Sequence, residues 1–174
     1  RGDNSIPVSM VWFSNFAFTP QRDIDNRYAN ASSRLAYVHQ LIVARKFSNS
    51  ISFEVLPTLV HRNLVERDPF GIQDENTFFS LGFAARVKLS QRVAIVADYF
   101  YNFSDYRTNH PNLNFYNPLG VGIEIETGGH VFNLAFTNAS GIIENNYLTT
   151  TSDDWLKGGY KFGFNISRVF TIGK

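Results

Sequence analysis

The sequence predicts an all-β protein, an antiparallel up-and-down transmembrane β-barrel with about eight strands in this chain. Three observations predict it. Apolar residues alternate with small or polar ones, the alternating runs are long, and short turns alternate with long polar loops. No apolar stretch reaches the roughly 18 residues that a membrane-spanning helix needs. The strands of a membrane barrel, by contrast, alternate and leave the mean hydropathy neutral.

The size of the chain and its lack of cysteine limit what the protein can be. Its 174 residues fit one domain, residues 1–174, with a formal net charge of +1. A charge so close to zero argues against nucleic-acid binding, which needs a basic surface. Without cysteine, disulfides, iron–sulfur clusters and thiol catalysis are excluded. Because the sequence opens at Arg1, with neither an initiator methionine nor a signal peptide, we expect a processed product or a fragment.

The first four alternating runs differ in regularity. In the first, Ile, Val, Met, Trp and Phe occupy even positions. The second is less regular, because His39 and Arg45 stand among its apolar residues. The third opposes Ile, Phe, Val, Pro and Leu to Ser, Glu, Thr and Arg, and the fourth opposes Phe, Leu and Val to Ser, Gly, Arg and Lys. We expect strands over Ile6–Phe18, Ser33–Phe47, 51–62 and 79–89.

The last four runs are shorter on average and richer in glycine. The fifth opposes Val, Ile, Tyr and Phe to Ala, Asp and Asn, and the sixth opposes Leu, Val and Ile to Gly and Glu. The seventh and eighth oppose Phe, Leu, Tyr and Ile to Asn, Ala, Thr, Lys, Gly and Ser. We expect strands over 93–103, 119–126, 132–137 and 160–170.

The connections between these runs alternate in length. Short turns are predicted near 48–50, 90–92 and 128–129, where Asn, Ser and Gly accept the positive φ of tight turns. Long polar loops are predicted over 19–32, 66–76, 104–117 and 139–158. Outer-membrane barrels have short periplasmic turns and long extracellular loops. The pattern therefore predicts an outer-membrane protein with both chain ends in the periplasm.

Alternation also fits a soluble β-sandwich acting as a binding module, so magnitudes must separate the two folds. Several runs span about 12–14 residues, whereas globular strands are usually near 5–6 and tilted membrane strands need at least 9–11. The apolar faces supply about 36 large side chains, and a small closed barrel holds only about a dozen inside. The opposite faces carry Gly and both signs of charge, which suit a crowded or wet lumen. The membrane barrel is the favoured interpretation.

Several segments together resemble an uncharacterised β-barrel family of Bacteroidota, a domain of unknown function whose members look like outer-membrane proteins. These segments are 33–41, 57–64, 125–132, 136–138 and 162–170. The resemblance covers nearly the whole chain in the same order. It implies an outer-membrane location, and it implies that this chain is the C-terminal part of a longer barrel with about twelve strands. It carries over no activity.

The C-terminal run resembles the terminal-strand signal that the barrel-assembly machinery reads, with bulky residues two or more positions before a final aromatic. The residues of this signal are Gly163, Phe164, Ile166 and Phe170. An ordinary last β-strand would read in the same way. The expected partners are outer-membrane lipid and lipopolysaccharide, the barrel-assembly machinery and other envelope proteins, with no nucleic acid.

Charged residues on the small-residue faces are the candidate functional residues. Those predicted to face the lumen are Glu54, Arg62, Arg86, Lys88, Asp98, Glu124, Glu126 and Lys161. Because an unpaired buried ion costs several kcal/mol, such charges must be paired or hydrated. They predict either a ladder of ion pairs that locks a narrow barrel or a charged constriction that selects polar solutes.

No catalytic centre emerges from the sequence. The four histidines form no spaced metal-binding pair, so we expect no metal and no cofactor. Ser and His are both present, for example Ser80 and His39, but no motif links them. We therefore expect a non-catalytic barrel, either a channel for small polar solutes or a structural component of an envelope complex. The alternative is an outer-membrane enzyme acting on lipid or envelope substrates.

Overall fold

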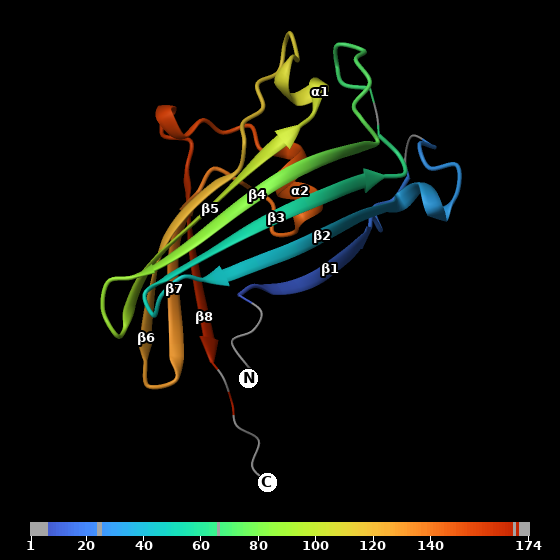
Figure 1. The fold of residues 1–174 in the computed structure, drawn as a ribbon. Coiled ribbons are helices and arrows are strands. Elements are labelled where there is room, and N and C mark those ends of the chain that lie inside the picture. The colour runs from blue at the N-terminus through green and yellow to red at the C-terminus, as the bar shows by residue number, and fades with distance from the viewer. Residues whose placement is uncertain (1–6, 24–25, 66, 169, 171–174) are drawn as a thin grey trace.

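The structure, a computed structural model, describes residues 7–23, 26–65, 67–168 and 170. Its strands form one antiparallel sheet in chain order, so that each strand pairs with its neighbours in sequence (Figure 1). The strands are β1 (Ser9–Phe18), β2 (Leu35–Lys46), β3 (Ile51–Arg62), β4 (Thr77–Lys88), β5 (Val93–Phe103), β6 (Leu119–Thr127), β7 (His130–Thr137) and β8 (Lys161–Arg168). The predicted all-β, up-and-down arrangement of eight strands is confirmed.

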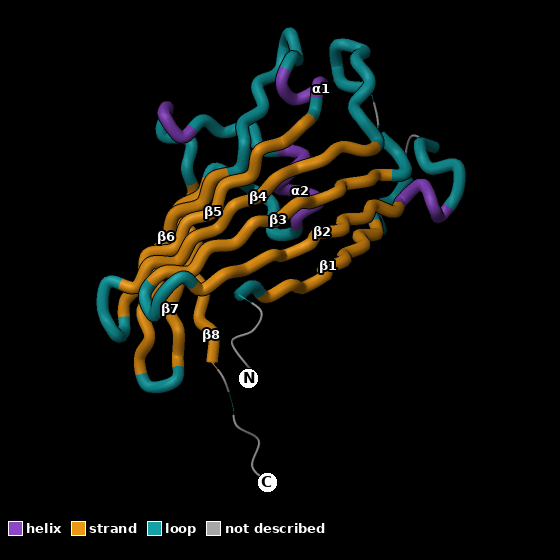
Figure 2. The backbone as a smooth tube through the Cα atoms, viewed as in Figure 1, coloured by secondary structure: helices purple, strands orange, loops and turns teal. Residues whose placement is uncertain are grey.

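The sheet curls strongly about the direction of its strands and encloses a concave face, giving a half-barrel (Figures 1 and 2). Within the described residues β1 pairs only with β2 and β8 only with β7, so each keeps one open edge. Two positions of the predicted strands, residues 6 and 169, lie outside the described residues.

The two ends of the sheet differ as the sequence predicts. One end, here the short-turn end, carries the connections at 47–50, 89–92 and 128–129. Gly128 (φ 54°) and Gly129 (φ 89°) both adopt left-handed conformations, which a two-residue hairpin turn requires and glycine accepts without strain. The opposite end, the long-loop end, carries all the longer connections (Figure 2).

The long loops contain short helices. These are η1 (Ala31–Arg34), α1 (Asp105–Thr108), α2 (Glu144–Thr150) and η2 (Trp155–Lys157). None of the helices in the described part of the chain is long and apolar enough to cross a membrane. Three of them lie at or beyond the long-loop end, whereas α2 turns back into the curve of the sheet (Figures 1 and 2).

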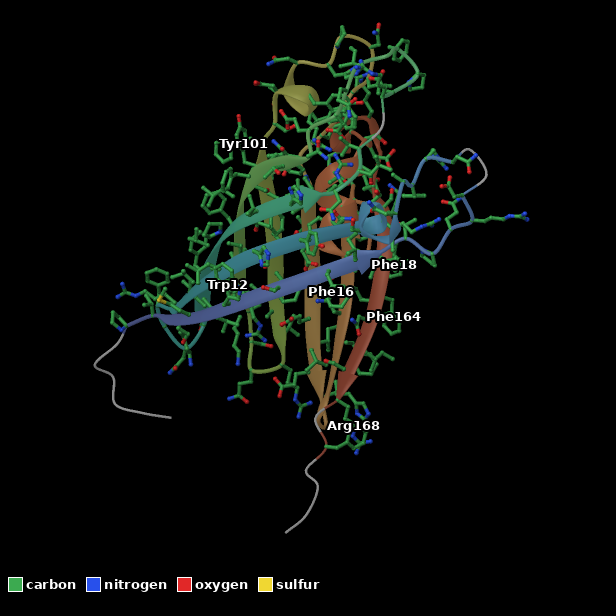
Figure 3. All side chains as sticks on the ribbon, turned by 90° about the vertical axis from the view of Figure 1, so that its right-hand side faces the viewer. Trp12, Phe16, Phe18, Tyr101, Phe164 and Arg168 are labelled. Carbon is green, nitrogen blue, oxygen red and sulfur yellow. The ribbon has the colours of Figure 1, made fainter. Side chains whose placement is uncertain are left out.

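Side chains on the convex face are large, apolar and exposed. Directly paired residues of an antiparallel sheet project to the same side, and the pairing of Trp12 with Leu41 and of Phe79 with Leu59 places these residues on the convex face. Phe16 keeps 74% of its surface exposed and Phe164 keeps 55%. Figure 3 shows several of these side chains projecting away from the sheet. The predicted outward direction of the bulky residues is confirmed.

The side chains of the concave face are less uniform in size and polarity than the sequence predicts. Near the short turns it is small and polar as predicted, but near the long loops it carries large buried apolar side chains. These form one cluster, Val38, Leu56, Val60, Phe78 and Phe100 from the strands with Leu148 from α2. Burial of apolar area contributes roughly 25 cal/mol per Å², so this cluster fixes α2 against the sheet.

Gly82 makes room for that cluster. It pairs with Leu56 and Phe100, and a Cβ placed on it would lie 2.3 Å from Cε1 of the Phe100 ring. Phe100 is buried, with its ring edge-on to Tyr147 of α2 at 5.5 Å between ring centroids. Because Gly82 has no side chain, the Phe100 ring of the neighbouring strand fits beside it. That ring in turn packs against α2.

Candidate functional site

The eight charged residues predicted to face inward all stand on the concave side of the sheet. Each is paired in register with concave-face residues, as Glu54 is with Ala44 and Arg62 with Ala36. They are Glu54, Arg62, Arg86, Lys88, Asp98, Glu124, Glu126 and Lys161. Their common side is the one that α2 covers near the long loops.

Few of these charges meet one another. The Arg86 guanidinium donates from Nε to Oε2 of Glu124 at 2.6 Å, which links β4 to β6 across β5. Within the described residues this is the one ion pair that joins two of the eight. Glu54, Lys88 and Glu126 stand in the half of the sheet nearer the short turns, without an ion pair among the described contacts. That half of the concave face is therefore a wet, charged surface.

The remaining two basic residues of the set pair with loop carboxylates that the sequence analysis did not single out. Arg62 contacts Asp74 at 2.5 Å between Nη2 and Oδ2. Lys161 contacts Asp153, in the loop between β7 and β8. These pairs tie the ends of β3 and β8 to the long loops, so they support the loops and do not line an open passage.

A loop cap covers the concave face at the long-loop end, formed by residues 63–65, 67–76, 104–118 and 138–160. Its centre is Arg107 in α1, whose side chain is 4% exposed. The Nη1 and Nη2 groups of Arg107 donate to the two carboxylate oxygens of Asp74, each at 3.0 Å. Its Nε donates to the carbonyl of Thr149 in α2 at 3.1 Å. One guanidinium thus joins all three segments of the cap.

The surroundings of Arg107 make this contact hard to replace. Its guanidinium carbon lies 4.4 Å from the centre of the Phe78 ring, within the range of a cation–π interaction. Burial lowers the pKa of Arg107, and the nearby Asp74 carboxylate opposes that shift by stabilising the charged form. A lysine could not make the same two-point contact, because it lacks the planar fork of an arginine.

A second contact in the cap joins Asp68 to His110. The Nδ1 atom of His110 accepts the backbone N–H of Leu113 at 2.9 Å, so its proton resides on Nε2. Nε2 lies 2.5 Å from Oδ2 of Asp68 and donates to it. Both ring nitrogens are occupied, which leaves none to act as a general base. The pair therefore holds two loops together.

The pKa of Asp68 reflects these contacts. Burial raises it, but hydrogen bonds from the N–H of Ile72, from His110 and from the N–H of Phe70 outweigh burial. The net pKa lies below the ordinary value of 3.8. The contacts therefore stabilise the ionised form of Asp68.

Ser80 and His39, noted in the sequence as a possible nucleophile and base, lie on opposite faces of the sheet. Ser80 is buried on the concave side, where its hydroxyl donates to the carbonyl of Tyr101. His39 stands on the convex side, with its Nδ1 2.9 Å from Oγ of Ser14, which also accepts from Nε1 of Trp12 at 2.8 Å. No local sequence signal predicts the contact of Ser14 with His39, because the two residues are 25 positions apart. On the apolar convex face, the side chains of Trp12, Ser14 and His39 thus form hydrogen bonds with one another.

The terminal-strand residues take alternating directions. Phe164 and Ile166 pair with Leu134 and Phe132 on the convex face, while Gly163 pairs with Ala135 on the concave face. Phe170 follows the strand and is 71% exposed. The guanidinium of Arg168 lies 4.7 Å from the centre of its ring. No group of three or more His, Asp or Glu residues able to hold a metal ion occurs within the part of the chain that the structure describes.

A curled antiparallel sheet with an exposed apolar outer wall and charged residues on its inner wall is what a lipid-embedded barrel requires. A family model described as "Membrane bound beta barrel domain (DUF5777)" matches residues 1–170. The chain belongs to this family. This membrane-bound β-barrel domain has no match among curated proteins or among solved structures. Its membership confirms the predicted membrane barrel and the predicted resemblance to a family of unknown function.

Proposed function

We propose that this domain is an integral outer-membrane β-barrel that passes small polar solutes and is restricted at its long-loop end by α2. The division of the concave face supports the proposal. Near the short turns, partly exposed charges including the Arg86–Glu124 pair offer a hydrated wall for polar solutes. Near the long loops, Leu148 and its partners fill the space that a solute would cross.

The orientation follows from the shape of the sheet. Long loops face the exterior and short turns face the periplasm in outer-membrane barrels. The first residue of β1, Ser9, and the last of β8, Arg168, lie at the short-turn end. We therefore propose that both chain ends are periplasmic and that the loop cap faces outward. The resemblance to a family of Bacteroidota supports the same location.

The open edges of β1 and β8 need partners in a membrane. Backbone N–H and C=O groups that face hydrocarbon without a hydrogen bond cost several kcal/mol each. Within the described residues neither edge is paired. We propose that further strands complete the barrel to a total of about twelve, which satisfies both edges at once.

Conductance in planar lipid bilayers tests the channel and its restriction separately. The experiment uses the full-length protein, its Leu148→Asp variant, which places a charge in the apolar cluster, and a matched Thr150→Asp variant on the exposed side of α2. We expect rare, small openings for the wild type and for Thr150→Asp, and frequent openings for Leu148→Asp. Silence in all three proteins would refute the channel, whereas equal conductance in all three would refute the restriction.

A structural role in an envelope complex is the second candidate. The cap favours it, because Arg107 and His110 fix the long loops into one surface that could present a constant shape to a partner. Silent bilayers together with co-purification of another envelope protein would support this role.

We further propose that the domain is non-catalytic and that the barrel-assembly machinery inserts it through Gly163, Phe164, Ile166 and Phe170. The position of Phe170 just beyond the last strand supports the assembly role. Replacing Phe170 with Ser should slow insertion without changing the folded barrel. Insertion at an unchanged rate would refute this assignment.

A further inference from the structure

Beneath the loop cap lies a cavity of about 200 Å³ that the channel proposal does not use. It is bounded by the end of β5, by the loop between β5 and β6, and by α2 with the residues that follow it. Its wall includes Asn102, Thr108, Tyr116, Thr149 and Thr151. At about 30 Å³ for each water in the liquid, the cavity has room for several waters or for one small ring.

One buried polar atom of this cavity lacks a partner. Asn102 is 6% exposed, and its Nδ2 donates to the carbonyl of Leu148 at 2.8 Å. Its Oδ1 has no hydrogen-bond partner. A buried acceptor without a partner destabilises the fold, and a ligand donor that reached Oδ1 would remove that cost.

The hydroxyl oxygens of two threonines in the wall can accept hydrogen bonds from a ligand, but their hydroxyl protons are already donated elsewhere. The Thr149 hydroxyl donates to the carbonyl of Asn145 at 2.6 Å, and the Thr151 hydroxyl donates to the carbonyl of Tyr147 at 2.7 Å. With those protons committed inside α2 and its C-terminus, both oxygens keep lone pairs free. A ligand that fits must therefore carry several hydrogen-bond donors.

The charges around the cavity cancel. Arg107 lines it, but Asp74 neutralises the guanidinium from behind through both Nη groups. Arg107 would repel a cationic ligand. It would attract an anionic ligand only weakly, because its guanidinium is already paired with Asp74. The aromatic rings of Phe115 and Tyr116 form another part of the wall. Such rings pack against the C–H face of a sugar ring.

We propose that this cavity binds a neutral polyhydroxylated ligand of monosaccharide size, whose hydroxyl groups donate to Asn102, Thr149 and Thr151 while its ring packs on the aromatic wall. The ligand can be a free sugar or a terminal sugar of a surface glycolipid, since both present the same chemistry. The proposal does not depend on the channel, because it concerns the cap alone.

Binding of sugars to the full-length protein in detergent tests the proposal. The probes are glucose, galactose and N-acetylglucosamine, the charged analogues glucosamine and glucuronate, and the oligosaccharide released from lipopolysaccharide, each followed by saturation-transfer NMR and calorimetry. We expect saturable binding of at least one neutral sugar and weaker binding of both charged analogues. Tighter binding of the oligosaccharide would identify a glycolipid as the source, and tighter binding of a monosaccharide would identify a free sugar.

Two cavity variants and one control locate the site. Thr108→Trp fills the cavity from an exposed position and should weaken binding about tenfold or more. Tyr116→Leu removes one of the two aromatic rings of the wall while its backbone N–H still donates to the carbonyl of Thr151, and should weaken binding severalfold. Thr150→Trp adds the same bulk to the exposed side of α2 and should change nothing. Three results would overturn the proposal: water as the sole occupant with no sugar bound, charged analogues bound as tightly as neutral sugars, or Thr108→Trp binding like Thr150→Trp.

Discussion

Arg107 and Asp74 stand 33 residues apart in sequence, yet two parallel N–H···O contacts of 3.0 Å join them in the centre of the loop cap. Arg62 at the end of β3 contacts the same carboxylate. The loops of the cap are therefore tied to the sheet and to one another by a buried charge cluster, and the cap should unfold as a unit with the strands below it.

Replacing Arg107 with Met should destabilise the protein strongly. The substitution leaves Asp74 with one cation in place of two and frees the carbonyl of Thr149, for a cost of about 2–4 kcal/mol. Arg107→Lys should fall between Met and wild type. Denaturant unfolding in lipid vesicles, followed by tryptophan fluorescence, measures the change. Arg67→Met, at an exposed arginine of the same cap, serves as the control, and equal losses for Arg67→Met and Arg107→Met would contradict the role of the buried pair.

Gly82→Ala should be costly, although the change adds one methyl group. Its Cβ would lie 2.3 Å from the Phe100 ring and 3.0 Å from Cβ of Leu56, so the cluster under α2 must move, at a cost of about 1–3 kcal/mol. Gly163→Ala is the matched control, since its nearest neighbour would be 3.8 Å away. The same unfolding assay compares the two. A neutral Gly82→Ala would show that Phe100 is not held in place.

Acid should loosen the contact between Asp68 and His110. Because the pKa of Asp68 in the folded protein lies below 3.8, its ionised form adds stability that is complete above that value and is lost as the pH falls through the lower, folded pKa. Hydrogen-exchange protection of the Phe70 and Ile72 amides should therefore fall at pH values below about 4. Asp68→Asn should lack this acid step. Protection that stays constant into strong acid in the wild type would exclude the mechanism.

The strands could be predicted from sequence because the convex face of every strand carries apolar side chains at alternate positions. The apolar cluster on the concave face was not predicted, although the sequence does hold a signal for it. Tyr99, Phe100 and Tyr101 are consecutive aromatics, and a strand must point the middle one away from the outer two. Phe78 and Phe79 form a similar doublet. These inward rings can be predicted only when both faces of each strand are considered.

The contacts of the loop cap could not be predicted in the same way. Asp74, Arg107 and Thr149 come from three separate loops, and their contacts depend on loop paths that no periodic pattern fixes. Alternation decides the face of the sheet on which each charged residue of a strand stands. Alternation does not predict their partners, since an ion pair such as Arg86 with Glu124 depends on the register and curvature of three strands.

Two neighbouring positions on β7 test which face of the sheet meets lipid. Leu134 pairs with Ile123 and Phe164 on the convex face, whereas Asn133 pairs with Glu124 and Asn165 on the concave face. Leu134→Arg should cost about 2–4 kcal/mol in vesicles, because it places a cation in hydrocarbon. Asn133→Arg should be tolerated, because its side chain stays in a hydrated space beside Glu124. If the protein were a water-surrounded sandwich with the opposite orientation, the two effects would be reversed, and Leu134→Arg would be the harmless substitution.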